Sequence, residues 1–103
     1  MCANDVSAAL GYYRNLFSPN VDISRLLLLA GASPDFLTSY LHEAPLICFY
    51  AYHGNTEMVS LLLQFGAQVD NTNSLGESAL VMSATNGKLE CARLLVENDD
   101  SGN

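Results

Sequence analysis

The sequence predicts an all-α solenoid, in which short helix pairs joined by long loops stack along one axis. The first observation is the segment 57–70, whose apolar residues leave only a narrow polar stripe of Glu57, Ser60 and Gln64. This pattern is typical of a short helix that is buried around most of its circumference. The second observation is that the segment recurs on both sides. Subtracting 35 from the residue numbers aligns Leu61, Leu62, Leu63, Gly66, Ala67 and Asp70 with Leu26, Leu27, Leu28, Gly31, Ala32 and Asp35. Adding 33 aligns Glu57, Leu61, Leu62 and Leu63 with Glu90, Leu94, Leu95 and Val96.

The first third of the chain is expected to hold two helices. Residues 6–17 place apolar side chains at near-helical spacing, although Gly11 in their middle costs about 1 kcal/mol relative to alanine. Residues 22–30 follow, and Asp22 suits the positive end of that helix's dipole. In this second helix we expect the neighbours to be contacted by Ile23, Leu26, Leu27 and either Leu28 or Leu29.

The remainder of the chain is expected to hold four more helices. Pro45 suits the first turn of one helix, because its missing N–H is not needed there. Thr56 is the expected N-cap of the next, and Gly66 ends that helix, since glycine readily adopts the left-handed conformation. The expected helices cover 45–53, 57–65, 78–85 and 89–97, and the expected long loops cover 31–43 and 66–76, where turn-forming residues gather.

Composition and charge narrow the class of partner. The chain of 103 residues carries four Lys and Arg against eleven Asp and Glu, for a formal net charge of −7. Nucleic acid and anionic membrane surfaces would be repelled, so we expect neither nucleic-acid binding nor direct membrane insertion. The longest aliphatic run, 26–30, is far shorter than a membrane span. A protein partner with basic or apolar segments fits better.

Cysteine usage indicates a reducing compartment. Cys2, Cys48 and Cys91 are odd in number and share no close spacing, and no secretory leader pattern precedes them. Three unpaired thiols suit the cytosol. We therefore expect a cytoplasmic protein, with any membrane association made through a larger assembly.

The segment 76–98, GESALVMSATNGKLECARLLVEN, resembles the ankyrin repeat, whose pattern is G-x-T-P-L-H-x-A-A-x-x-G-H-L-E-I-V-x-L-L-L. A recurrence of about 33 residues is also the ankyrin period. The resemblance implies two full repeats, 36–70 and 71–100, after a degenerate N-terminal capping unit at 1–35, with a tail at 101–103. The matching residues are Gly76, Leu80, Ala84, Gly87, Leu89, Glu90, Leu94 and Leu95, and in the preceding unit Ala51, Gly54, Glu57, Val59, Leu61–Leu63, Gly66 and Ala67.

A finer resemblance covers roughly 18–98. The Ser-Pro-Asn-Val at 18–21 and the Ala-Pro-Leu at 44–46 are similar to the first ankyrin repeats of the TANC and rolling-pebbles scaffold proteins. Those scaffolds carry further modules, so the chain is expected to be a piece of such a protein. The resemblance implies an intracellular scaffold or adaptor that acts at postsynaptic or muscle-fusion membranes.

Catalysis is not expected. Cys48 and His53 lie about 140° apart around a helix, so they do not form a nucleophilic pair, and a thiol-dependent enzyme is a remote alternative. Cys48, His42 and His53 lack the spacing of metal ligands, and no phosphate-binding motif occurs. We expect no cofactor and no metal.

The expected function is therefore protein–protein interaction through a surface. Stacked repeats form a concave face from their loops and first helices, and solenoids bind partners on such faces. The alternative is a structural connector whose concave face is idle. If nothing stacks on the C-terminal face, we also expect low stability or self-association through it, because the last helix pair carries little polarity. The resemblance implies ten partner-binding positions: Leu41, His42, Ala44, Tyr52, His53, Ser74, Leu75, Glu77, Thr85 and Asn86.

Overall fold

The computed structural model describes residues 6–11 and 13–98 of the chain. These residues form seven α-helices and only two isolated antiparallel bridges, so the predicted all-α class is confirmed. The helices are α1 (Val6–Leu10), α2 (Tyr13–Phe17), α3 (Val21–Leu29), α4 (Leu46–His53), α5 (Thr56–Gln64), α6 (Ala79–Thr85) and α7 (Leu89–Glu97). The expected tail at 101–103 lies outside the described residues.

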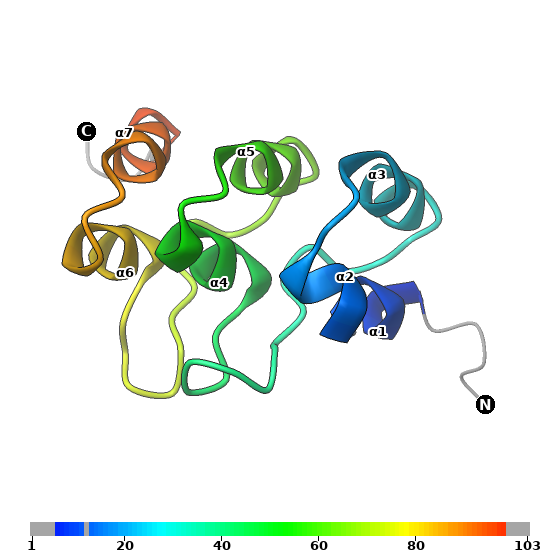
Figure 1. Ribbon diagram of the computed structural model, residues 1–103, viewed down its shortest axis with the longest axis horizontal. Helices are drawn as coiled ribbons and strands as arrows, with labels where there is room; N and C mark the ends of the chain where they lie inside the picture. The colour runs from blue at the N-terminus through cyan, green and yellow to red at the C-terminus, as the bar shows by residue number, and fades with distance from the viewer. Residues whose placement is uncertain (1–5, 12, 99–103) are drawn as a thin grey trace.

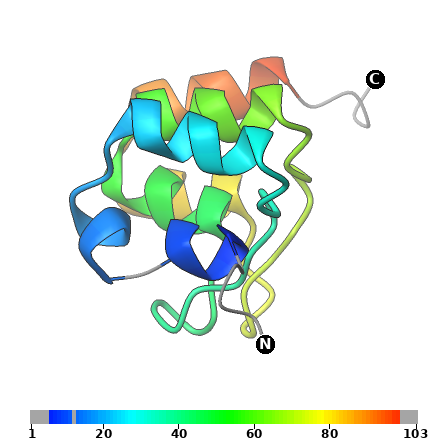
Figure 2. The ribbon, with the colours of Figure 1, turned by 90° about the vertical axis from the view of Figure 1, so that its right-hand side faces the viewer.

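The helices form two layers that run along the longest axis (Figure 1). One layer contains α3, α5 and α7, and the other contains α1, α2, α4 and α6. Figure 2 shows α3 in front of α5 and α7, with the axes of the three running in similar directions. Two long loops project from the α4–α6 layer, away from α5 and α7 (Figure 1). The arrangement is a solenoid about 40 Å long and 24 × 22 Å in cross-section.

Helix α4 is the centre of the core. Its residues from Leu46 to Ala51 are all buried, because α4 lies between α2, α5 and α6. The Phe49 ring meets the Phe17 ring edge-on, with 5.3 Å between centroids, and the Tyr50 hydroxyl donates a hydrogen bond of 3.3 Å to the carbonyl of Asn15. These contacts join the first unit to the second.

The prediction of one helix over 6–17 is wrong, because the segment forms α1 and α2 with a break between them. The Gly11 N–H bonds to the carbonyls of Ser7 and Ala8, which closes α1. The Phe36 ring then packs directly on Gly11, where an added Cβ would lie 2.3 Å from a ring carbon. An alanine at this position would therefore require the Phe36 ring to shift.

Helices α3, α4, α5 and α6 each start one residue away from the predicted position, and two of these starts show why. The N-cap of α5 is Asn55 and not Thr56: the Asn55 side chain accepts a hydrogen bond of 3.1 Å from the Met58 N–H, and Thr56 is the first helical residue. Helix α3 begins one residue early, at Val21, where the Asn20 side chain accepts from the Ile23 N–H. Asparagine is as good an N-cap as threonine or better, so both starts have a local cause.

The buried face of α3 agrees only in part with the expected one. Leu28 is buried and Leu27 packs against the core, as expected, and Leu29 is the exposed member of the pair Leu28 or Leu29. Ile23 and Leu26 are exposed, so the expectation that they face neighbours is wrong, and Ser24 is buried in their place. The face of α3 that points away from α5 is apolar.

Candidate functional site

The two long loops differ in length by two residues. A bridge between Leu37 and Pro45 closes the first loop, and a bridge between Thr72 and Ser78 closes the second. Seven residues separate the first pair and five separate the second. The extra residues lie at the tip of the first loop, which is 40–43.

The tip of the first loop has an unusual backbone. Leu41, His42 and Glu43 have φ angles of 52°, 62° and 60°, so three consecutive non-glycine residues are left-handed. Such a conformation costs roughly 1–2 kcal/mol per residue and persists only where the surroundings impose it. Here the second loop imposes it: the Ser74 N–H donates a hydrogen bond of 2.8 Å to the His42 carbonyl.

Asn73 organises both loops through its buried side-chain amide. Its Nδ2 donates to the Leu41 carbonyl at 3.0 Å and to Glu77 Oε1 at 2.9 Å. Its Oδ1 accepts from the backbone N–H groups of Leu75 and Glu77, at 3.0 and 2.9 Å. Sequence reasoning identified Asn73 only as a turn former, because its partner Leu41 lies 32 residues away.

Between these loops and the inner helices lies a groove of about 220 Å³, which we call the concave groove. Six of its seven lining residues are among the ten predicted partner-binding positions, and Met82 is the one that the sequence did not suggest. The groove is lined by Leu41 and His42 from the first loop, Leu75 and Glu77 from the second, Tyr52 from α4, and Met82 and Thr85 from α6.

The other four predicted positions lie outside the groove. Ala44 is completely buried, so its side chain cannot contact a partner, and that prediction is wrong. The two-residue extension places Ala44 beneath the loop, where its carbonyl accepts a hydrogen bond of 2.8 Å from the Thr38 N–H. Ser74 is exposed, but its N–H is already bonded to the first loop.

His53 and Asn86 form an exposed rim beside the groove. The His53 ring packs at 4.6 Å from the Phe49 ring and meets the Tyr52 ring edge-on at 5.3 Å. Asn86 Nδ2 donates a hydrogen bond of 2.7 Å to the Tyr52 carbonyl, which fixes α4 against α6. Burial, and then the nearby Lys88 ammonium, lower the pKa of His53 from 6.5, which favours the neutral imidazole.

The buried thiols are not suited to nucleophilic chemistry. Cys48 Sγ lies 3.5 Å from the Asn71 carbonyl, and burial, followed by the Glu77 charge, raises the Cys48 pKa to about 12. Burial also raises the pKa of Cys91, although Lys88 opposes the shift. Since the thiolate is the nucleophile, both groups are inert at neutral pH. Cys2 lies outside the described residues.

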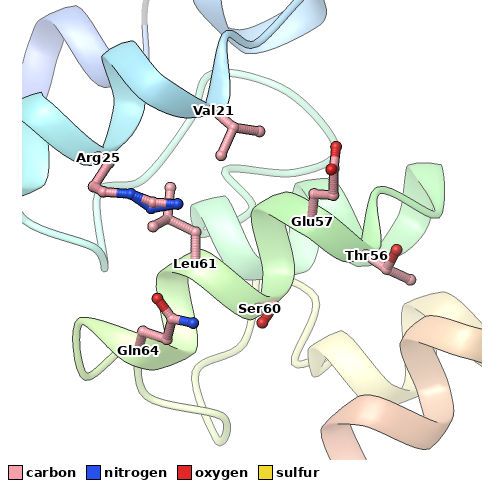
Figure 3. Close-up of a pocket in the computed structure, with 7 residues that line it drawn as sticks. All are labelled: Val21, Arg25, Thr56, Glu57, Ser60, Leu61 and Gln64. Atoms are coloured by element: carbon pink, nitrogen blue, oxygen red, sulfur yellow. The ribbon is translucent and has the colours of Figure 1, made fainter.

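A larger pocket of about 360 Å³ lies on the opposite side of the solenoid, between α3 and α5 (Figure 3). Val21 and Arg25 line it from α3, and five residues of α5 line the other side. A smaller pocket of about 210 Å³ repeats at the junction of α5 and α7, where Glu90, Arg93, Leu94 and Glu97 correspond to Glu57, Ser60, Leu61 and Gln64. Because the pocket recurs at each junction, it is a feature of helix stacking and not a specific site.

None of the helices within residues 6–11 and 13–98 combines the length and the apolar content that a membrane span requires. Within the same residues, no three His, Cys, Asp or Glu side chains are grouped so that they could hold a metal ion.

Comparison with known proteins agrees with the repeating helix pairs. The family model for ankyrin repeats, in three copies, matches residues 15–103. The ankyrin repeat and SOCS box protein 11 of Pongo abelii is 38% identical over 80 residues, which is 75% of this chain and 23% of that protein. The human palmitoyltransferase ZDHHC17 is 43% identical over 61 residues, which is 59% of this chain and 10% of that protein. The chain thus spans less than a quarter of the length of these relatives.

Proposed function

The chain belongs to the ankyrin-repeat family, and from this premise we propose that it is a non-enzymatic module that binds a protein partner in the concave groove. Ankyrin repeats are in general protein-interaction modules. The observation that carries the proposal is the convergence of six predicted positions, from two loops and two helices, on one groove. Solenoids use their concave surface in this way.

The lining of the groove indicates the chemistry of the partner. Leu41, Leu75 and Met82 offer apolar surface, and Tyr52 offers a large, half-buried ring. Glu77 adds a carboxylate whose Oε1 is already held by Asn73. We propose that the groove takes a large apolar side chain next to a basic one in an extended segment of the partner. The net charge of −7 would also speed the approach of a basic partner.

The strained loop tip supports recognition over a purely structural role. A connector would not need three left-handed residues at the end of its loop, and an observed backbone outlier is a reasonable basis for a functional hypothesis. The strain holds Leu41 and His42 at the groove before any partner arrives. A site held in its bound geometry loses less entropy on binding.

The setting in which this module works is a finer proposal. We propose that the chain serves an intracellular scaffold or adaptor, in keeping with its resemblance to the TANC and rolling-pebbles proteins. The relatives reported above are other ankyrin-repeat proteins, so they support the interaction role and leave the scaffold itself as a proposal. A cytoplasmic location is proposed on the same basis.

The test compares two exposed leucines of similar exposure. Leu75 is 61% exposed and lines the groove, whereas Leu37 is 58% exposed and does not. Peptides are selected from a displayed library against the unmodified chain, and their Kd values are measured for the Leu75→Lys and Leu37→Lys variants. The proposal expects at least tenfold weaker binding for Leu75→Lys and no change for Leu37→Lys. Equal effects at both positions, or binding unaffected by either, would contradict it.

A further inference from the structure

Both ends of the described solenoid are apolar. At the α3 end, Leu26 is 64% exposed, with Ile23 and Leu29 beside it. At the α7 end, Val81 is 48% exposed, and three further apolar side chains of α6 and α7 are exposed as well: Leu80, Leu89 and Val96. A solenoid end that faces water ordinarily carries polar residues. Neither end of the described residues has that character.

The repeat register shows what these positions do inside the solenoid. Leu26 corresponds to Leu61, which is 2% exposed because it packs at the α3–α5 junction. Val81 corresponds to Cys48, which is 0% exposed because α6 covers α4. Repeat positions that are buried at an internal junction are therefore exposed at the two ends. Each end has the surface of a junction that lacks its second half.

The two ends are complementary halves of one junction. At the α3–α5 junction, α3 supplies Val21 and Arg25 and α5 supplies Glu57 and Leu61 (Figure 3). The repeat register aligns Leu89 and Arg93 of α7 with Val21 and Arg25 of α3. It aligns Asp22 and Leu26 of α3 with Glu57 and Leu61 of α5. Val96 occupies the place of Leu28, which is buried. The α7 end and the α3 end thus carry apolar side chains and opposite charges at the register positions of an internal junction, and Arg93 also lines the pocket between α5 and α7.

We propose that two copies of this chain stack head to tail, with α7 of one copy against α3 of the second copy. Leu89 and Val96 cover Leu26 of the second copy, and Arg93 faces Asp22 of the second copy. The intrahelical pair of Arg93 with Glu90 does not prevent this, because it is 3.7 Å long and exposed. The contact uses different surfaces on the two copies, so it is heterologous, and each pair leaves one free end of each kind to which further copies can add. It leaves the concave groove open and does not depend on the proposed function.

The test blocks each end separately and then combines the blocked chains. Leu26→Glu blocks the α3 end and Leu89→Glu blocks the α7 end, and Leu37→Glu is the matched control at an exposed leucine of neither end. Mass is measured by sedimentation equilibrium from 10 µM to 1 mM, and circular dichroism checks that each variant is folded. For the unmodified chain and the control, the expected result is an average mass that rises with protein concentration. Each blocked variant alone stays monomeric, and an equimolar mixture stops at a dimer.

Reversing the charges of Asp22 and Arg93 gives a second, independent test. Asp22→Arg and Arg93→Asp each weaken association alone, and mixing the two restores it between chains, because the reversed charges face one another again. A monomeric unmodified chain at 1 mM overturns the proposal. A dimer that persists in one blocked variant alone also overturns it, because such a dimer must be symmetric. A mixture of blocked variants that stays monomeric overturns it too, because the two end faces then do not bind each other.

Discussion

The side-chain amide of Asn73 donates a hydrogen bond of 3.0 Å to the carbonyl oxygen of Leu41, which lies 32 residues earlier in the chain. The bond joins the second long loop to the strained tip of the first. The same side chain also bonds to Glu77 and to the Leu75 N–H, so one buried residue holds three residues that line the concave groove. The geometry of the groove therefore depends on contact between two repeats, and not on either loop alone.

Replacing Asn73 by alanine is expected to lower both stability and binding. The substitution leaves the Leu41 carbonyl and the Glu77 N–H without their partners, and each unsatisfied buried group costs about 1–3 kcal/mol. Thermal unfolding followed by circular dichroism measures the loss. Asn73→Asp keeps the acceptor but replaces the donor with a carboxylate beside that of Glu77, so it should not recover the stability that Asn73→Ala loses. An unchanged Tm for Asn73→Ala would show that the loops are held by other contacts.

Glycine substitutions at the loop tip are expected to separate stability from binding. His42 and Glu43 have φ angles of 62° and 60°, so glycine at either position relieves strain. After the extra entropy of glycine in the unfolded chain is subtracted, each variant should gain roughly 0.5–1 kcal/mol. Only His42 lines the groove, so His42→Gly should weaken partner binding while Glu43→Gly retains it. Urea unfolding and peptide affinity, measured on both variants, check the two halves of this prediction.

The break between α1 and α2 is expected to depend on the Phe36 ring. Gly11→Ala places a methyl group 2.3 Å from that ring, and such overpacking costs typically 1–3 kcal/mol. The double variant Gly11→Ala, Phe36→Leu removes the flat ring and should recover part of the loss. Urea midpoints of the single and double variants measure this coupling. Additive losses would mean that the ring does not oppose the methyl group.

Alkaline pH is expected to weaken the fold through Cys48. Burial raises the pKa of its thiol from 9.0 to about 12. Between these values the folded chain holds the proton and the unfolded chain releases it, so the free energy of unfolding falls as pH rises, by up to about 1.4 kcal/mol per pH unit. Well below pH 9 this thiol is protonated in both states, so it adds no pH dependence there. Urea unfolding at pH 8 to 11 should show this slope, and Cys48→Ala should show a shallower one. Identical slopes would indicate that other groups, such as Tyr50, govern the effect.

The sequence was most informative where a single helix carries its own signals. Helix α7 begins at Leu89 and ends at Glu97 as predicted, because its apolar periodicity is regular and Asn86-Gly87 gives a clear turn before it. Helices that depend on distant contacts were harder to predict. The break at Gly11 follows from the Phe36 ring, which lies in a later loop.

The concave groove was predictable in part for a similar reason. The repeat register located Tyr52, Leu75 and Thr85, since those positions keep their place in each unit. It failed at Ala44, because the first loop is two residues longer than the second and the register shifts there. The role of Asn73 could not be read from its neighbours, since it acts on Leu41 across the repeat boundary. The division of the chain into 1–35, 36–70 and 71–100 stays a prediction.

Site-specific photocrosslinking from inside the concave groove tests the central claim most directly. A photoreactive phenylalanine analogue replaces Leu75 in the groove in one preparation and Leu37 outside it in another, and both are irradiated in a cell extract. The account predicts a discrete protein adduct from position 75, competed by unmodified chain, and none from position 37. Adducts of equal yield from both positions, or from position 37 alone, would contradict it.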